Sequence, residues 1–206
     1  MRKDGEKKEA KNISAERPWL KSYPDGLPSD IDIPNVSLAQ AFDEAAEKWK
    51  DKTAICFYGR KISYRELRNL VDRFAAALHG LGVQKGDRVA LFLLNSPQFA
   101  IAYFGALKIG AILTPINPVY VTPEVKYQLE DSRADTIVCQ DILYDFVEKT
   151  GLNLKRIILT GIGEYLPRVK KFLGRSILRV VYRKMELPVM KIKEGDQEKI
   201  VLTLIT

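Results

Sequence analysis

The chain has 206 residues, of which 46% are hydrophobic and 29% charged, and this mixture excludes general disorder because it can supply a sizeable core. The formal net charge of +7 comes from one segment: residues 164–193 contain nine Lys or Arg and two Glu, whereas the charges elsewhere cancel. A nucleic-acid-binding protein usually carries its basic charge across the binding domain. This distribution therefore argues against nucleic acid as a partner.

Two cysteines and one histidine restrict the chemistry that the chain can perform. Cys56 and Cys139 each lie in an apolar, strand-like stretch, and we predict two buried free thiols in a reducing, cytoplasmic compartment. His79 lies near the end of a predicted helix, where interaction with the helix dipole is favoured over a role as a catalytic base. The sequence therefore predicts neither a His/Cys metal site nor a Ser-His-Asp triad.

Two stretches of the sequence show whether a signal peptide or a membrane-spanning helix is expected. Residues 1–17 are charged and have no apolar core, which predicts a disordered or frayed tail rather than a signal peptide. Residues 89–107 carry no charge, but residues 95–98 (NSPQ) divide them into halves too short to span a bilayer. We expect a buried strand followed by a buried helix.

The first predicted elements begin at residue 37. Ser37 is a suitable N-cap for a helix. One face of this helix carries Leu38, Ala41, Phe42, Ala45 and Trp49. Residues 53–58 are strand-like, Gly59 and Arg60 have the pattern of a hairpin turn, and residues 61–63 form the returning strand.

The clearest helix follows. Ser63 and Glu66 form a capping-box pattern, the helix reaches about Leu81, and Gly82 supplies the stop. Apolar strands and amphipathic helices then alternate. The strands are expected at residues 88–94, 111–116, 136–139 and 156–160, and the helices at 96–110, 122–132 and 142–149. This alternation predicts an α/β fold with a mainly parallel sheet and helices on both faces.

The turns after strands are where such folds bind phosphates, and none matches a known fingerprint. Gly161 and Gly163 follow a strand, but Leu166 stands where a dinucleotide fingerprint requires a third glycine, so we interpret this turn as structural. The basic segment 164–193 has an amphipathic helical pattern. Such a helix can contact an anionic membrane weakly, although a solvated helix packed on the domain is the favoured interpretation.

Four sequence stretches resemble a known family. Residues 62–67 (ISYREL) resemble the first core motif of the acyl-adenylate-forming superfamily, and residues 86–90 (GDRVA) resemble the start of one of its strands. Residues 106–118 (ALKIGAILTPINP) are similar to its second core motif. Residues 19–28 (WLKSYPDGLP) are similar to the opening of fatty acyl-CoA synthetases in particular. The resemblance covers residues 17–160 and returns over the last apolar stretch.

The resemblance implies the N-terminal subdomain of an adenylate-forming enzyme, which converts a fatty acid and ATP to an acyl-adenylate and then to a thioester with coenzyme A. Thr206 matches the first threonine of the loop that holds the ATP phosphates, and it is the only cofactor-binding residue that the resemblance assigns to this chain. The other loop residues, the acidic magnesium ligand and the catalytic lysine would lie beyond it. No catalytic or metal-binding residue is assigned, and we expect the chain alone to be inactive.

The expected organisation is a tail (1–17), an α/β scaffold (18–163), a basic helical segment (164–193) and a strand leading to the ATP loop (194–206). Three interpretations stay open. The chain is part of a long- or medium-chain fatty-acid–CoA ligase, completed by a second polypeptide or truncated; or a non-catalytic binding or assembly module; or a basic peripheral membrane protein. We also expect self-association, as a homodimer for example, because the last predicted strand would leave an uncovered sheet edge.

Overall fold

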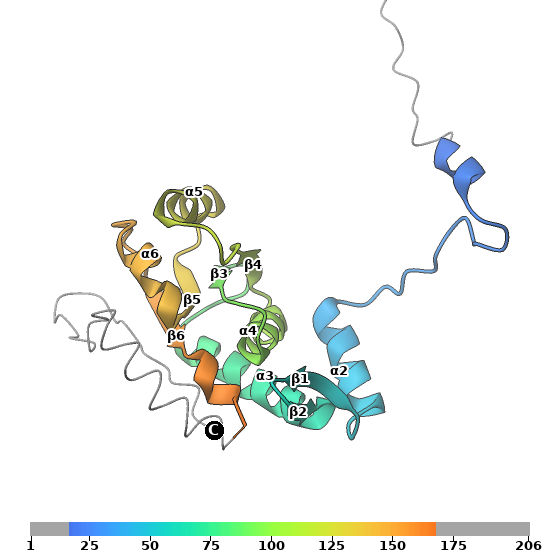
Figure 1. The fold of residues 1–206 in the computed structure, drawn as a ribbon, viewed down its shortest axis with the longest axis horizontal. Helices are drawn as coiled ribbons and strands as arrows, with labels where there is room; N and C mark the ends of the chain where they lie inside the picture. Colours follow the sequence, from blue (N-terminus) through green and yellow to red (C-terminus); the bar gives the residue numbers. More distant parts are fainter. Residues whose placement is uncertain (1–16, 168–206) are drawn as a thin grey trace, which may run out of the picture. The chain divides into compact units, whose positions relative to one another are not determined.

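The computed structural model describes residues 17–167, which belong to two compact units divided after Asn35. In the first unit a short 3-10 helix, η1 (Pro18–Ser22), is followed by an irregular segment (Figure 1). The Arg17 guanidinium donates to both carboxylate oxygens of Asp30, each at 2.8 Å, and so closes this segment into a loop. Residues 1–16 of the predicted tail, residues 168–193 of the predicted basic segment (164–193) and the predicted strand 194–206 lie outside the described residues.

The second unit begins with helix α2 (Leu38–Lys48), and the predicted cap is confirmed because Ser37 Oγ accepts a hydrogen bond from the Gln40 amide at 3.1 Å. The buried residues of α2 are Phe42 and Ala46. Leu38, predicted on the same face as Phe42, is 60% exposed. It occupies the first turn, and only the later turns of α2 contact the core.

A hairpin follows, with strands β1 (Thr53–Phe57) and β2 (Arg60–Ser63) paired antiparallel. Its turn consists of Tyr58 and Gly59, which have φ angles of 49° and 93°. Two successive residues with positive φ are typical of the tight hairpin turn whose twist matches that of the strands. The sequence prediction placed the turn one residue too late, at Gly59 and Arg60.

The prediction for Cys56 is wrong, because its thiol is exposed rather than buried. Among the described strands β1 pairs only with β2, and this two-stranded ribbon packs one face against the core, through residues such as Ile55 and Phe57. Cys56 lies between these two residues and points to the other face. The second prediction is confirmed, since Cys139 is 0% exposed.

Helix α3 (Tyr64–Gly80) starts and stops as the sequence predicts. Ser63 Oγ accepts from the Glu66 amide at 3.1 Å, and Gly82 follows the helix with a φ of 76°. The Glu66 carboxylate accepts a hydrogen bond from Arg60 at 2.9 Å, which links the start of α3 to the hairpin. The buried face of α3 comprises Leu67, Val71, Phe74, Ala75 and Leu78.

The centre of the fold is a four-stranded parallel sheet in the order β4-β3-β5-β6, which confirms the predicted α/β class. Its strands are β3 (Arg88–Phe92), β4 (Ile112–Pro115), β5 (Thr136–Gln140) and β6 (Arg156–Thr160). The connecting helices are α4 (Pro97–Lys108), α5 (Thr122–Ser132) and α6 (Tyr144–Glu148). Two short 3-10 helices, η2 (Asp141–Leu143) and η3 (Ile162–Tyr165), follow β5 and β6.

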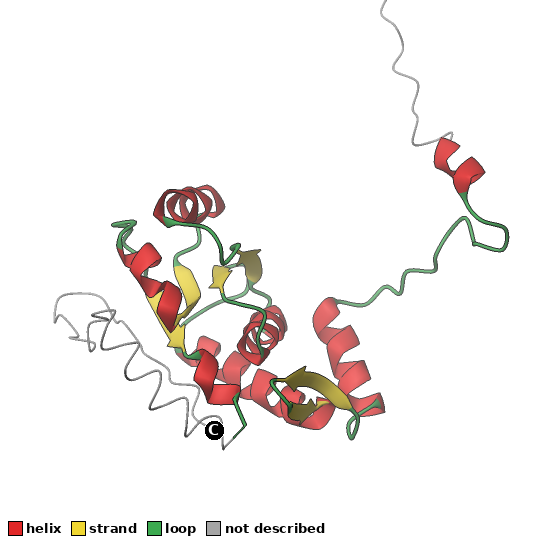
Figure 2. Ribbon diagram, in the orientation of Figure 1, coloured by secondary structure: helices red, strands yellow, loops and turns green. Residues whose placement is uncertain are grey.

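Helices cover both faces of this sheet (Figure 2). On β3, Val89 and Leu91 belong to a core shared with α3 and α4, whereas Ala90 and Phe92 belong to a core shared with α5 and α6. All four side chains are fully buried. The uncharged stretch is therefore a buried strand and a buried helix, as predicted, and no helix within residues 17–167 is long and apolar enough to cross a membrane.

Helices α3 and α4 approach each other closely at Gly105. A Cβ atom at this position would lie 2.8 Å from Phe74 Cδ1 and 3.3 Å from the Val71 carbonyl oxygen. Only glycine fits such an approach without displacing the neighbouring helix.

Candidate functional site

The strand order defines where a ligand would bind in a fold of this kind. From β3 the chain passes through α4 to β4 on one side, and then returns through α5 to β5 on the other side of β3. Ligands of open α/β sheets bind in the crevice at the carboxyl ends of the strands where the order reverses. In this chain the start of α4, the end of β5 and the turn after β6 lie at these carboxyl ends of the strands.

Two buried glutamines lie at the carboxyl ends of the strands. Gln98, in the first turn of α4, and Gln140, the last residue of β5, are both 0% exposed. The side-chain amide of Gln98 donates to the Gly161 carbonyl at 2.7 Å, and that of Gln140 donates to the Thr160 carbonyl at 3.2 Å. Both Oε1 atoms lack a donor within the described part of the chain. The two amides thus join α4 and β5 to the end of β6, and each keeps one acceptor that a water or further protein group satisfies.

The turn after β6 is closed by a carboxylate. Glu164 accepts hydrogen bonds from the Gly161 amide at 3.0 Å and from the Thr160 hydroxyl at 3.2 Å. A Cβ atom at Gly161 would lie 3.0 Å from Asp141 Oδ2, so a second carboxylate faces the same glycine. The Gly161 amide and the Thr160 hydroxyl are therefore not free to bind a phosphate, and two carboxylates beside them disfavour an anion at this turn. This arrangement is consistent with the interpretation of the turn as structural.

The described residues do not fit the groups that the resemblance implies. Within residues 17–167, no three His, Cys, Asp or Glu side chains come together in a way that could hold a metal ion. Thr206, the predicted cofactor-binding residue, lies outside the described residues, and its role stays a prediction. No step of an ATP-dependent reaction can be assigned to residues of this part of the chain.

The remaining candidates are not placed for catalysis. His79 lies in the last turn of α3 and is exposed, as predicted for a residue near a helix end. Burial, with a further contribution from the Asp141 carboxylate, raises the pKa of the Cys139 thiol well above its ordinary value. Cys139 is therefore protonated and is not a nucleophile at neutral pH.

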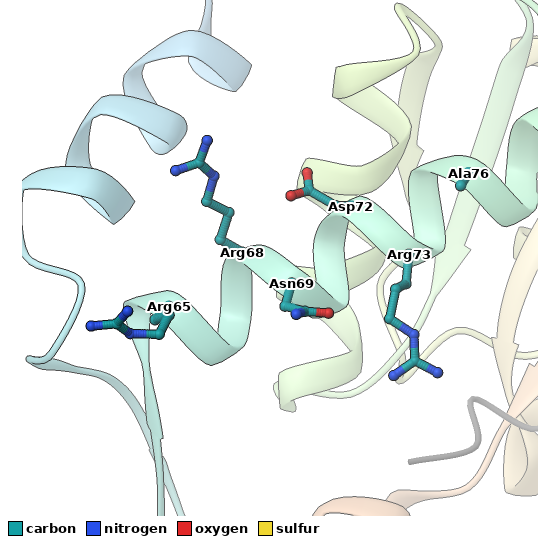
Figure 3. Close-up of a pocket in the computed structure, with 6 residues that line it drawn as sticks. All are labelled: Arg65, Arg68, Asn69, Asp72, Arg73 and Ala76. Carbon is teal, nitrogen blue, oxygen red and sulfur yellow. The ribbon is translucent and has the colours of Figure 1, made fainter.

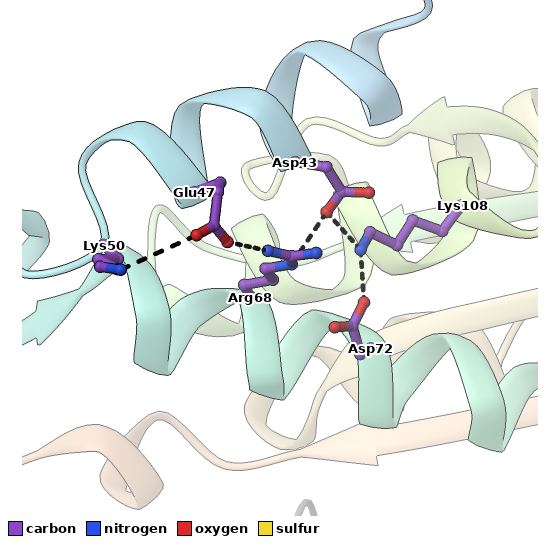
Figure 4. A network of polar contacts seen from close by, with 6 residues as sticks. All are labelled: Asp43, Glu47, Lys50, Arg68, Asp72 and Lys108. Carbon is purple, nitrogen blue, oxygen red and sulfur yellow. Dashed lines mark hydrogen bonds and ion pairs between the residues drawn. The ribbon is translucent and has the colours of Figure 1, made fainter.

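The residues of the second motif connect helices. Lys108, in the last turn of α4, bonds to Asp43 of α2 at 2.6 Å and to Asp72 of α3. Arg68, which points from α3 toward α2 (Figure 3), bonds to Asp43 at 3.5 Å and to Glu47 at 2.9 Å (Figure 4). Burial lowers the pKa of Lys108, but its hydrogen bonds to the two aspartates outweigh burial and raise it overall. This network joins three helices and is architectural.

The glycine of the same motif has a comparable role. Gly110 has a φ of 76°, and a Cβ atom there would lie 2.8 Å from Lys85 Cγ. Its carbonyl accepts a hydrogen bond from the Gly86 amide at 2.9 Å, so the two motif glycines fix the turns that lead into β4 and β3. Gly110 is thus needed for close backbone approach and not for ligand binding.

Sequence reasoning missed one further buried group, Arg156 at the start of β6. This side chain is 7% exposed and donates to the Leu81 carbonyl at 2.6 Å, the Gly82 carbonyl at 2.9 Å and the Thr136 hydroxyl at 3.2 Å. It satisfies carbonyls at the end of α3, which a helix terminus leaves unpaired. A basic residue at the start of an apolar strand was the only available signal.

The strand order and the helices on both faces of the sheet define an open, doubly wound α/β domain. Comparisons with known proteins identify the family to which it belongs. The family described as "AMP-binding enzyme" matches residues 42–171, and the chain belongs to this family. The chain is 37% identical over 163 residues to the long-chain-fatty-acid–CoA ligase of Bacillus subtilis, covering 78% of this chain and 29% of that protein. It is 37% identical over 172 residues to the ligase of the same name from Yersinia pestis, covering 82% and 31%.

Solved structures of CoA ligases resemble the fold of this chain over part of their length. A long-chain-fatty-acid-CoA ligase from Archaeoglobus fulgidus superposes with a TM-score of 0.58 and 30% identity, over 66% of this chain and 29% of that one. The anthranilate CoA ligase AuaEII gives a TM-score of 0.58 with 29% identity, over 69% and 28%. The chain therefore spans less than a third of the length of these relatives, and it has the fold of their N-terminal domains.

Proposed function

We propose that this chain is the N-terminal scaffold of a cytoplasmic enzyme that joins a long- or medium-chain fatty acid to coenzyme A with ATP and magnesium. The observation that carries the proposal is the 37% identity to a long-chain-fatty-acid–CoA ligase over 163 residues. The motif residues Ser63, Lys108 and Gly110 support it, because each has a structural task that an intact scaffold requires.

We further propose that the 206-residue polypeptide does not form acyl-adenylate by itself. Adenylation requires cations and N–H donors around the developing charge of pyrophosphate. At the carboxyl ends of the strands, the Gly161 amide and the Thr160 hydroxyl are already bonded to Glu164. The remaining part of the reaction apparatus would come from further polypeptide, either in the same protein or as a separate chain.

The test is a complementation assay. The 206-residue chain is mixed with a polypeptide that corresponds to the part of the B. subtilis ligase following the matched region, and pyrophosphate release and thioester formation are measured with ATP, magnesium, coenzyme A and fatty acids of several lengths. We expect no product from either polypeptide alone and fatty-acid-dependent product from the mixture. The matched control replaces Gly105 with valine, which separates α3 from α4 and should abolish complementation. Acyl-adenylate formation by the 206-mer alone would contradict its proposed inactivity.

A second function, assembly, is favoured by one surface. The edge strand β4 and the residues after it expose four large apolar side chains: Ile112 (50%), Val119 (77%), Val121 (47%) and Tyr127 (71%). Among the described strands, β4 pairs only with β3, so its outer backbone groups can bind another strand. We propose self-association through this surface when it is not covered by further polypeptide.

A further inference from the structure

We draw no further inference here: the strongest candidate, the cluster of buried side-chain amides formed by Gln98 at the start of α4 and Gln140 at the end of β5, belongs to the candidate site already described, and both residues are 0% exposed, so that a ligand has no access to their free amide oxygens.

Discussion

Replacing Arg156 by methionine tests whether its guanidinium holds the end of α3 to the sheet. Methionine keeps most of the apolar stem of the side chain and removes its donors. Three hydrogen bonds are lost, to the carbonyls of Leu81 and Gly82 and to the Thr136 hydroxyl. The expected result is a less stable protein in which α3 frays at its carboxyl end.

The size of the expected loss of stability depends on which hydrogen-bond acceptors stay buried in the Arg156→Met variant. Hydrogen bonds to a charged group contribute about 1.5–3 kcal/mol each, which would suggest a large loss. The Gly82 residue is exposed, however, so its carbonyl regains water in the variant, and the variant also avoids the cost of burying a charge. The half-buried Leu81 carbonyl is the group left unsatisfied, because the Thr136 hydroxyl still donates to Asp135 at 3.0 Å. We therefore expect a net loss of about 2 kcal/mol.

Urea unfolding followed by circular dichroism measures this loss. With a slope of roughly 2 kcal/mol per molar urea, the midpoint should fall by about 1 M. Arg156→Lys should be no better than Arg156→Met, because one ammonium group cannot reach acceptors in three directions. Arg88→Met, at an exposed position, should change stability by less than about 0.5 kcal/mol. An Arg156→Met protein as stable as the unmodified chain, or full rescue by lysine, would refute the reasoning.

Four other experiments have clear expected outcomes. A thiol reagent should modify Cys56 in the folded protein and Cys139 only after unfolding; equal rates would contradict the burial that the structure shows. Burial raises the pKa of the Cys139 thiol in the folded state, so the unfolded state loses this proton first as the pH rises. The free energy of unfolding should therefore fall above about pH 9, with the slope expected for the titration of one group. Cys139→Ala should lack this effect. Gly105→Val should destabilise the chain by roughly 1–3 kcal/mol through its clash with Phe74, and a neutral result in urea unfolding would show that α3 and α4 can separate freely. Tyr127→Lys should reduce concentration-dependent self-association in light scattering, whereas an unmodified chain that stays monomeric at high concentration would remove the case for assembly through this surface.

Local signals were sufficient for most elements of the fold. Ser63 caps α3 and Gly82 follows it because an N-cap and a residue with positive φ are determined by near neighbours in the chain. The continuous apolar run of β3 predicted a strand covered on both faces, and Val89 and Ala90 do belong to separate cores. The turn of the hairpin was shifted by one residue because Tyr58, an uncommon residue at positive φ, takes its first position.

Long-range contacts explain what the sequence could not predict. Cys56 belongs to an apolar run, and it is exposed because no element within residues 17–167 covers its face of the two-stranded ribbon. Gln98 is 63 residues from the Gly161 carbonyl to which it donates, and Arg60 and Tyr165 come together from distant parts of the chain. Motif resemblance identified the family and indicated that Gly110 ends a helix, but it did not reveal that Lys108 joins α4 to α2 and α3.

The distance along the chain between Leu81 and Arg156 has a consequence during synthesis. These two residues are 75 positions apart, and the bond between them cannot form until β6 has left the ribosome. At the usual rate of translation, adding 75 residues takes roughly 4–15 s. During that interval α3 is already synthesised, but its carboxyl end is not yet bonded to Arg156. The apolar strand β3 also lacks β5, its neighbour in the sheet, until β5 is synthesised. In the first half of this scaffold, the side of β3 that β5 and its helices later cover therefore stays unpartnered for several seconds.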